Sequence, residues 1–225
     1  MIILNRLVRL ALWIGVLWSV RGTRRHSRVA TTWVTHLVGN TLLLGLPEIY
    51  YSLAALFKLD RHTRRAPDSL VGTANEILRE MVVDNPHYAG YVAPVAGAII
   101  VAHPRINLYK SNWANRQLLG LGLDSIPHGM TAFTLTQMVF DFLASPAIAR
   151  RFPQAWQHST RISAGVLAAA SLCYETGEFL IHLQELRLVK DDPSQMAMEW
   201  SFPDTLQDLF ANTVGWLLAV VVHFS

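Results

Sequence analysis

Long apolar runs alternate along the chain with short clusters of basic and polar residues. A helix that crosses about 30 Å of hydrocarbon needs about 20 mostly apolar residues. The first run is not read as a cleavable signal peptide, because a basic stretch at 21–28 stands where a small-residue cleavage site belongs. Six runs approach the required length, and we expect each to form a transmembrane helix: 4–20, 29–57, 88–102, 117–144, 162–186 and 205–225.

The segment between the second and third runs has a different pattern. It begins with a basic stretch at 58–65 and continues over 68–83 with apolar residues at helical spacing. This spacing predicts a short amphipathic helix that lies on the membrane surface or caps the bundle. We therefore predict an all-α, multi-pass membrane bundle with about six transmembrane helices plus this short helix, in one integral membrane domain over 1–225.

Composition supports the membrane assignment. Of the 225 residues, 52% are hydrophobic and only 16% are charged, whereas about a quarter of the residues in ordinary soluble domains are charged. This argues against a soluble domain, a disordered chain or a nucleic-acid binder, and the expected partners are membrane lipids and other membrane proteins. The single cysteine, Cys173, excludes an intramolecular disulfide and a zinc–thiolate framework.

The last three predicted spans, within 116–225, carry nearly all the ionisable residues that lie inside apolar runs, whereas 1–115 is less characteristic. Such residues are costly in a membrane and indicate function. Their spacing places them on one face of each helix, and the start of the fourth span, the end of the fifth and the start of the sixth lie on one side of the membrane. The three polar faces are therefore expected to meet in one pocket. Its candidates are Asp124, His128, Glu175, Glu178, His182, Asp204, Gln207, Asp208 and Asn212.

Several carboxylates in a medium of low dielectric constant cannot all stay ionised without compensation. These three spans contain no Lys or Arg, so a bound cation or shared protons would have to compensate. Carboxylates with imidazole suit Mg, Mn, Fe or Zn. Three interpretations stay open: a metal or catalytic pocket, a proton or ion relay, and a polar interface that only holds helices together. Pro127 is expected to kink the helix at the pocket.

Each pocket residue has an expected role in the metal interpretation. Glu178 or His182 would act as the general base toward a metal-bound water. The expected metal ligands are Asp124, His128, Glu175 and Asp208, and the expected substrate contacts are Asn212, Gln207 and Asp204.

Several other polar residues receive different predictions. Asp204 is alternatively the N-cap of the last helix, because it follows Pro203 and precedes an apolar run. Glu185 and Asp141 are expected to reach the membrane interface, and Glu48 has no evident partner.

Three motifs carry a resemblance to a known family: Asp124-Ser-Ile-Pro-His128-Gly129, Tyr174-Glu175-Thr-Gly-Glu178-Phe179, and the stretch from Asp204 to Gly215. Together they resemble the YjdF-like bacterial inner-membrane proteins and, more distantly, the VanZ-like family. The likeness covers roughly 120–217, with Phe179 where the pattern usually has Trp, and without a Gly-rich segment in 187–202. It implies a multi-pass location in the bacterial inner membrane. The VanZ-like likeness implies envelope chemistry or glycopeptide resistance.

The predicted function is a metal-dependent membrane hydrolase that acts on an amphiphilic or lipid-linked substrate. One alternative is a small transporter coupled to protons or ions. The other is a non-catalytic accessory subunit of a larger membrane complex, associated with a pigment or haem through His36, His103 or His128.

Overall fold

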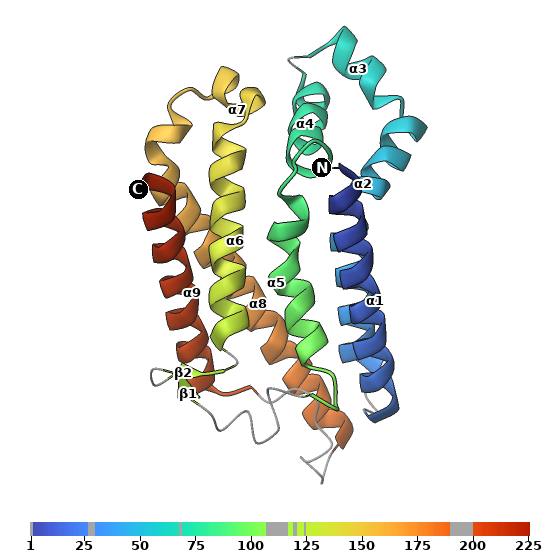
Figure 1. Ribbon diagram of the computed structural model, residues 1–225, viewed down its shortest axis with the longest axis vertical. Coiled ribbons are helices and arrows are strands. Elements are labelled where there is room, and N and C mark those ends of the chain that lie inside the picture. Colours follow the sequence, from blue (N-terminus) through green and yellow to red (C-terminus); the bar gives the residue numbers. More distant parts are fainter. Residues whose placement is uncertain are drawn as a thin grey trace.

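The computed structural model describes residues 2–26, 30–67, 69–106, 117–118, 121–123, 125–189 and 200–225. Nearly all of these residues are helical, which confirms the predicted all-α class. The described residues form six long helices. Five of them run roughly along the long axis of the molecule, and the sixth, α8, crosses them obliquely (Figure 1). The six helices are α1 (Ile2–His26), α2 (Ala30–Leu56), α5 (Tyr88–Val101), α6 (Ser125–Ala144), α8 (Ser159–Val189) and α9 (Phe202–Phe224).

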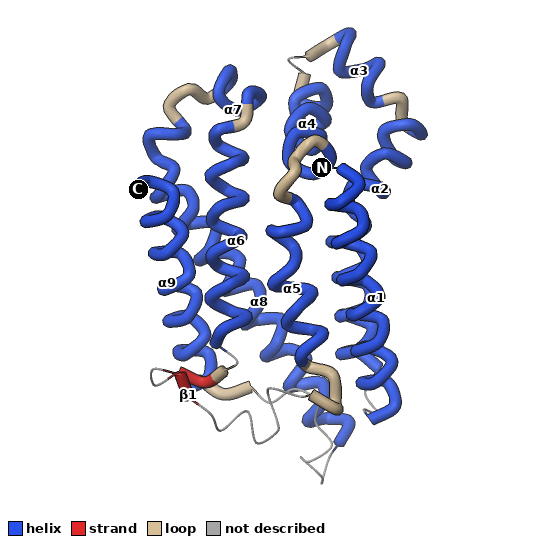
Figure 2. The backbone as a smooth tube through the Cα atoms, viewed as in Figure 1, coloured by secondary structure: helices blue, strands red, loops and turns tan. Residues whose placement is uncertain are grey.

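Short elements lie at the two ends of this bundle (Figure 2). At the upper end are α3 (Leu59–Arg65), α4 (Leu70–Leu78) with a π-helical turn at Arg79–Val83, α7 (Pro146–Arg151) and a 3-10 turn at Ala155–His158. At the lower end, β1 (Gln117–Leu118) pairs antiparallel with β2 (Leu121–Gly122).

The helix predicted over 68–83 is confirmed by α4 and the π-helical turn. The hydroxyl oxygen of Ser69 caps α4 by accepting a hydrogen bond of 3.1 Å from the backbone N–H of Gly72.

The prediction of six transmembrane helices is not supported. Among the described residues, three helices are long and apolar enough to cross a membrane: Ile3–Arg25, Ala155–Val189 and Phe202–Phe224. A fourth is obtained only if Trp33–Leu56 and Leu59–Arg65, which meet at a bend of 67°, form one span. These helices indicate a membrane protein.

The other two predicted spans fall short for different reasons. Helix α5 has 14 residues, about 21 Å at 1.5 Å per residue. Helix α6 carries a hydroxyl, amide or ionisable side chain on every turn. It also begins at Ser125, because part of the predicted segment forms the β1–β2 hairpin instead.

The N-terminal region, formed by α1, α2 and α5, surrounds an apolar core and contains an ion pair whose arginine is buried. Val16, Leu44 and Val92 are among the core residues of this region. The guanidinium of Arg9, with the residue only 6% exposed, binds both carboxylate oxygens of Glu48 at 2.6 and 2.8 Å. Arg9 also donates to the carbonyl of Leu44 and to the side chain of Asn5. Glu48 therefore has the partner that the sequence did not reveal.

In the C-terminal region, the backbones of α6 and α9 approach each other closely. Ala211, Gly215 and Ala219 recur every fourth residue along α9 and are all buried. A Cβ at Gly215 would overlap the carbonyl oxygen of Gly129 and lie 3.1 Å from the Cβ of Ala132. Small residues at such a stripe allow helix backbones to pack tightly in a membrane.

The direction of the helices places three of their ends together. Helices α6 and α9 begin, and α8 ends, at the lower end of the bundle in Figure 1. The sequence predicts that these three ends lie on one side of the membrane. Their arrangement positions the polar faces of the three helices near one end of the molecule.

Candidate functional site

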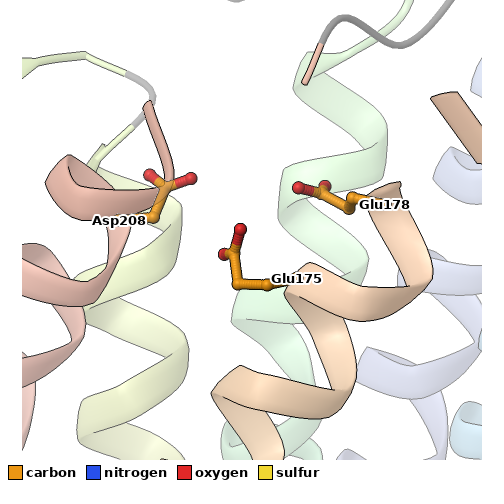
Figure 3. A group of neighbouring side chains, drawn as sticks. All are labelled: Glu175, Glu178 and Asp208. Atoms are coloured by element: carbon orange, nitrogen blue, oxygen red, sulfur yellow. The ribbon is translucent and has the colours of Figure 1, made fainter. Parts of the chain in front are cut away.

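Three carboxylates from two helices converge near the lower end of the bundle. Each of Glu175, Glu178 and Asp208 offers one oxygen within 4.8 Å of the others. Figure 3 shows the two glutamates projecting from α8 toward the space in front of Asp208 on α9. Glu175 is 8% and Asp208 5% exposed, whereas Glu178 is only partly buried. The convergence predicted from spacing is therefore present for these three side chains.

The two oxygens of Glu175 have different surroundings. Its Oε2 accepts a hydrogen bond of 2.8 Å from the hydroxyl of Thr205 on α9. Its Oε1 is buried and has no hydrogen-bond partner among the described residues. A buried acceptor without a partner costs about 1–3 kcal/mol, and more when it is charged. This oxygen is therefore suited to receive a proton or a cation.

His128 contributes from a third helix, α6. Its Nε2 lies 3.5 Å from Oδ2 of Asp208. The imidazole packs edge-to-face against Tyr174, with ring centroids 5.8 Å apart. His128 is thus placed either to orient the Asp208 carboxylate or to add a nitrogen ligand beside it.

The remaining predicted site residues are dispersed around this centre. Gln207 donates to the hydroxyl of Ser125 at 3.3 Å, and Asn212 donates to the hydroxyl of Ser171 at 3.1 Å. The Nδ1 atom of His182 accepts a hydrogen bond of 3.3 Å from the backbone N–H of Trp200.

Asp124 lies outside the described residues. Asp204 lies in the first turn of α9 but does not cap it. The cap is Ser201, whose hydroxyl accepts from the backbone N–H of Asp204, so the alternative prediction for Asp204 is wrong.

A hollow of about 260 Å³ lies beside the carboxylates and is lined by Glu175, Thr176, Phe179 and Trp200. The rings of Phe179 and Trp200 pack edge-to-face, with centroids 4.9 Å apart. The indole N–H of Trp200 is buried and has no acceptor among the described residues. The lining of the hollow is thus mostly apolar, and two of its residues, Glu175 and Trp200, each carry a buried polar atom without a partner among the described residues.

Sequence reasoning missed Thr205 and Trp200 as parts of the site. A signal existed for Thr205, because it precedes Asp208 by three residues and so shares its helix face. No spacing signal existed for Trp200, which precedes the start of α9.

Three further predictions about polar residues are wrong. Pro127 lies in the first turn of α6, where a backbone N–H has no helical acceptor, so it does not have to kink the helix. Asp141 accepts a hydrogen bond from the hydroxyl of Tyr91 on α5 instead of facing the headgroups. Glu185 is fully buried at 0% exposure.

Comparisons with known proteins do not extend this description. No family model matches the sequence, and no curated protein or solved structure shows a significant similarity to it. The resemblance to the YjdF-like and VanZ-like proteins stays a prediction.

Proposed function

We propose that the protein is a metal-dependent membrane hydrolase whose cation is held by Glu175, Glu178 and Asp208. The observation that carries this proposal is the gathering of three carboxylates within 4.8 Å, one of which has a buried oxygen that no described residue pairs with. Carboxylates held this close repel one another in a medium of low dielectric constant unless a cation or protons lie between them. A divalent ion provides the larger compensation.

The ligand set bears on the choice of metal. Three carboxylate oxygens alone suit hard ions such as Mg or Mn. His128, beside Asp208, adds an imidazole nitrogen, which also suits Fe or Zn. We assign Glu178 to the ligand set as well as to the role of general base predicted from the sequence, because it lies as close as the other carboxylates.

The surroundings of the site favour an amphiphilic substrate. The hollow beside Glu175 has the aromatic walls of Phe179 and Trp200, which suit an apolar chain, and the neighbouring carboxylate cluster would take the polar head through its cation. A divalent ion held by these three carboxylates would supply the acidified water that hydrolysis at neutral pH needs. Glu178, the least buried of the three carboxylates, is the one best placed to exchange a proton with solvent.

Metal content tests this proposal directly. The full chain is purified in detergent with Mn, Zn and Mg supplied, and its bound metals are measured by elemental analysis. We expect about one ion per chain in the wild type and in Asp141→Asn, a control that removes a carboxylate at the other end of α6. The Glu175→Gln/Asp208→Asn double variant is expected to lose the ion. A folded wild type without metal would overturn the metal site and favour shared protons.

The two alternatives predicted from the sequence, a transporter and an accessory subunit, predict different experimental results. Hydrogen bonds from Asn212 to Ser171 and from Trp216 to Ser163 continue between α8 and α9 beyond the carboxylates, which is the observation that favours a proton-coupled transporter. Proton uptake by liposomes that contain the metal-free protein would support this second function. Visible absorbance of the purified protein would instead support an accessory subunit that binds a pigment or haem.

A further inference from the structure

A second hollow lies at the opposite end of the bundle from the carboxylates, beside α3, α4 and α7 (Figure 1). Its volume of about 530 Å³ falls in the range of small-molecule sites. Residues far apart in the sequence build it. They are Asp60, Thr63, Arg64, Pro67, Asn75, Glu76, Arg79, Arg150 and Arg151.

The lining of this hollow has an excess of positive charge. It contains four guanidinium groups and two carboxylates. Glu76 pairs with both Arg150 and Arg151, the latter at 3.1 Å, and Arg79 pairs with Asp84 at 3.2 Å. Arg64 has no ion pair among the described residues. Among the described residues, one guanidinium remains in excess even when Asp84 is counted.

Several features fix the position of these groups before any ligand binds. The buried amide of Asn75 donates to the hydroxyl of Thr63 at 2.9 Å, and its oxygen accepts from Tyr50 at 2.9 Å. Arg151 also donates to the carbonyl of Ala147 in α7 and to that of Pro67. These bonds tie α3, α4 and α7 into one frame around the hollow.

We propose that this hollow binds a phosphate ester, in the form of the headgroup of an anionic lipid. Arginine presents several N–H donors in a planar fork that matches phosphate oxygens. The hollow is lined by residues of α3, α4 and α7, and these helices lie at the upper end of the bundle in Figure 1. Leu70 and Val71 at the start of α4 are 86% and 52% exposed, which suits contact with the acyl chains just below a headgroup. A free phosphate compound shares the headgroup chemistry but makes no use of these apolar residues.

The test measures thermal unfolding of the full chain in mixed micelles with increasing phosphatidylglycerol, phosphatidylcholine or inorganic phosphate. We expect phosphatidylglycerol to raise the melting temperature in a saturable way and phosphatidylcholine to have no such effect. Arg64→Gln, which breaks no ion pair among the described residues, is expected to raise the half-saturating lipid concentration at least fivefold. Arg25→Gln, which removes an exposed arginine from the other end of α1, is the matched control and should leave it unchanged.

A second variant distinguishes a ligand site from a merely structural cluster. Glu76→Gln releases Arg150 and Arg151 from their carboxylate, so it should lower the half-saturating concentration severalfold even if it lowers the melting temperature without lipid. Saturable stabilisation by millimolar inorganic phosphate, lost in Arg64→Gln, would assign the site to a free phosphate compound and overturn the lipid assignment. Equal responses of wild type and Arg64→Gln to phosphatidylglycerol would overturn the site itself.

Discussion

The N-terminal and C-terminal regions of the bundle both bury ionisable side chains, Arg9 in the one and Glu175 and Asp208 in the other, but they compensate the charge differently. Between α1 and α2, Glu48 accepts two hydrogen bonds from Arg9, which is held by two further acceptors. Between α8 and α9, three carboxylates lie together, and none of them has a Lys or Arg partner among the ion pairs of the described residues; His128 lies beside Asp208.

The difference teaches which cluster is built for structure and which for a ligand. A carboxylate with its own guanidinium and a full set of hydrogen bonds needs nothing more. In the carboxylate cluster, the buried Oε1 of Glu175 finds no partner in the part of the chain that the structure describes, and a bound ion or a proton would offset the energetic cost of this. Helices α6 and α9 are held together by close backbone contact along Ala211, Gly215 and Ala219. Their packing therefore does not depend on the carboxylate cluster, which is available to bind a ligand.

The largest loss of stability is expected from a substitution that disrupts the close contact between α6 and α9. In Gly215→Ala, the new Cβ meets the backbone carbonyl of Gly129, which cannot move aside like a flexible side chain. We expect the free energy of unfolding in detergent to fall by about 3 kcal/mol, at the upper end of the range for overpacked cores. Gly165→Ala is the matched control, because no atom lies within 4 Å of a Cβ at that position on α8. Equal stability of the two variants would contradict the close approach of α6 and α9.

The second-largest loss of stability is expected from a substitution that removes the carboxylate charge opposite Arg9 in the N-terminal region. Glu48→Gln removes the negative charge and one of the two acceptor oxygens opposite the buried Arg9 guanidinium, which then has only neutral acceptors: the new amide oxygen, the Leu44 carbonyl and Asn5. Breaking a fully buried pair costs about 3–5 kcal/mol; Glu48 is 50% exposed, so we expect a loss of about 2 kcal/mol. Chemical denaturation in detergent measures it. A loss below about 0.5 kcal/mol would place this pair with ordinary surface ion pairs.

Much of this architecture follows from patterns in the sequence. Apolar length placed a helix in each of the six predicted segments, and the spacing of Glu175, Glu178 and Asp208 on two helices predicted their meeting. Periodicity carries this information because side chains three or four residues apart share a helix face.

The remaining features depend on contacts between distant segments. Arg9 and Glu48 are 39 positions apart in the sequence, so no local pattern predicts their pairing. In the same way, no local pattern predicts that Asp141 meets Tyr91 on another helix. Helix length also depends on where neighbouring loops begin, which is why α5 and α6 fall short of the predicted spans. The hollow near Arg64 escaped prediction for the same reason, since its lining comes from several separate elements.

Replacing a glutamate by glutamine, which destabilises the protein at Glu48, is expected to have the opposite effect on stability at the carboxylate cluster. In metal-free protein, Glu175→Gln removes a negative charge that lies close to Glu178 and Asp208 and keeps an acceptor for Thr205. We therefore expect the free energy of unfolding to stay the same or rise by up to about 1 kcal/mol, because like-charge repulsion in a medium of low dielectric constant is relieved. The melting temperature should change in the same direction. Added Mn or Zn should reverse the order, since only the wild type keeps the full ligand set. A loss as large as that of Glu48→Gln would contradict the contrast between the two regions.

The smallest effect concerns an ion pair outside the membrane-spanning segments. Desolvation raises the pKa of the Glu76 carboxyl, but hydrogen bonds and charge from Arg150 and Arg151 outweigh it, so the pKa lies below its ordinary value of 4.5. A carboxyl with a lowered pKa stabilises the fold fully above its unfolded value, and this contribution is lost as the pH falls through the folded value. The stability difference between wild type and Glu76→Gln, about 1 kcal/mol or less, should therefore be constant near neutral pH and shrink below about pH 4.5. Melting curves from pH 3 to 7 measure it, and the shrinkage should be weaker in an Arg150→Gln background, because one of the two partners that lower the pKa is then missing.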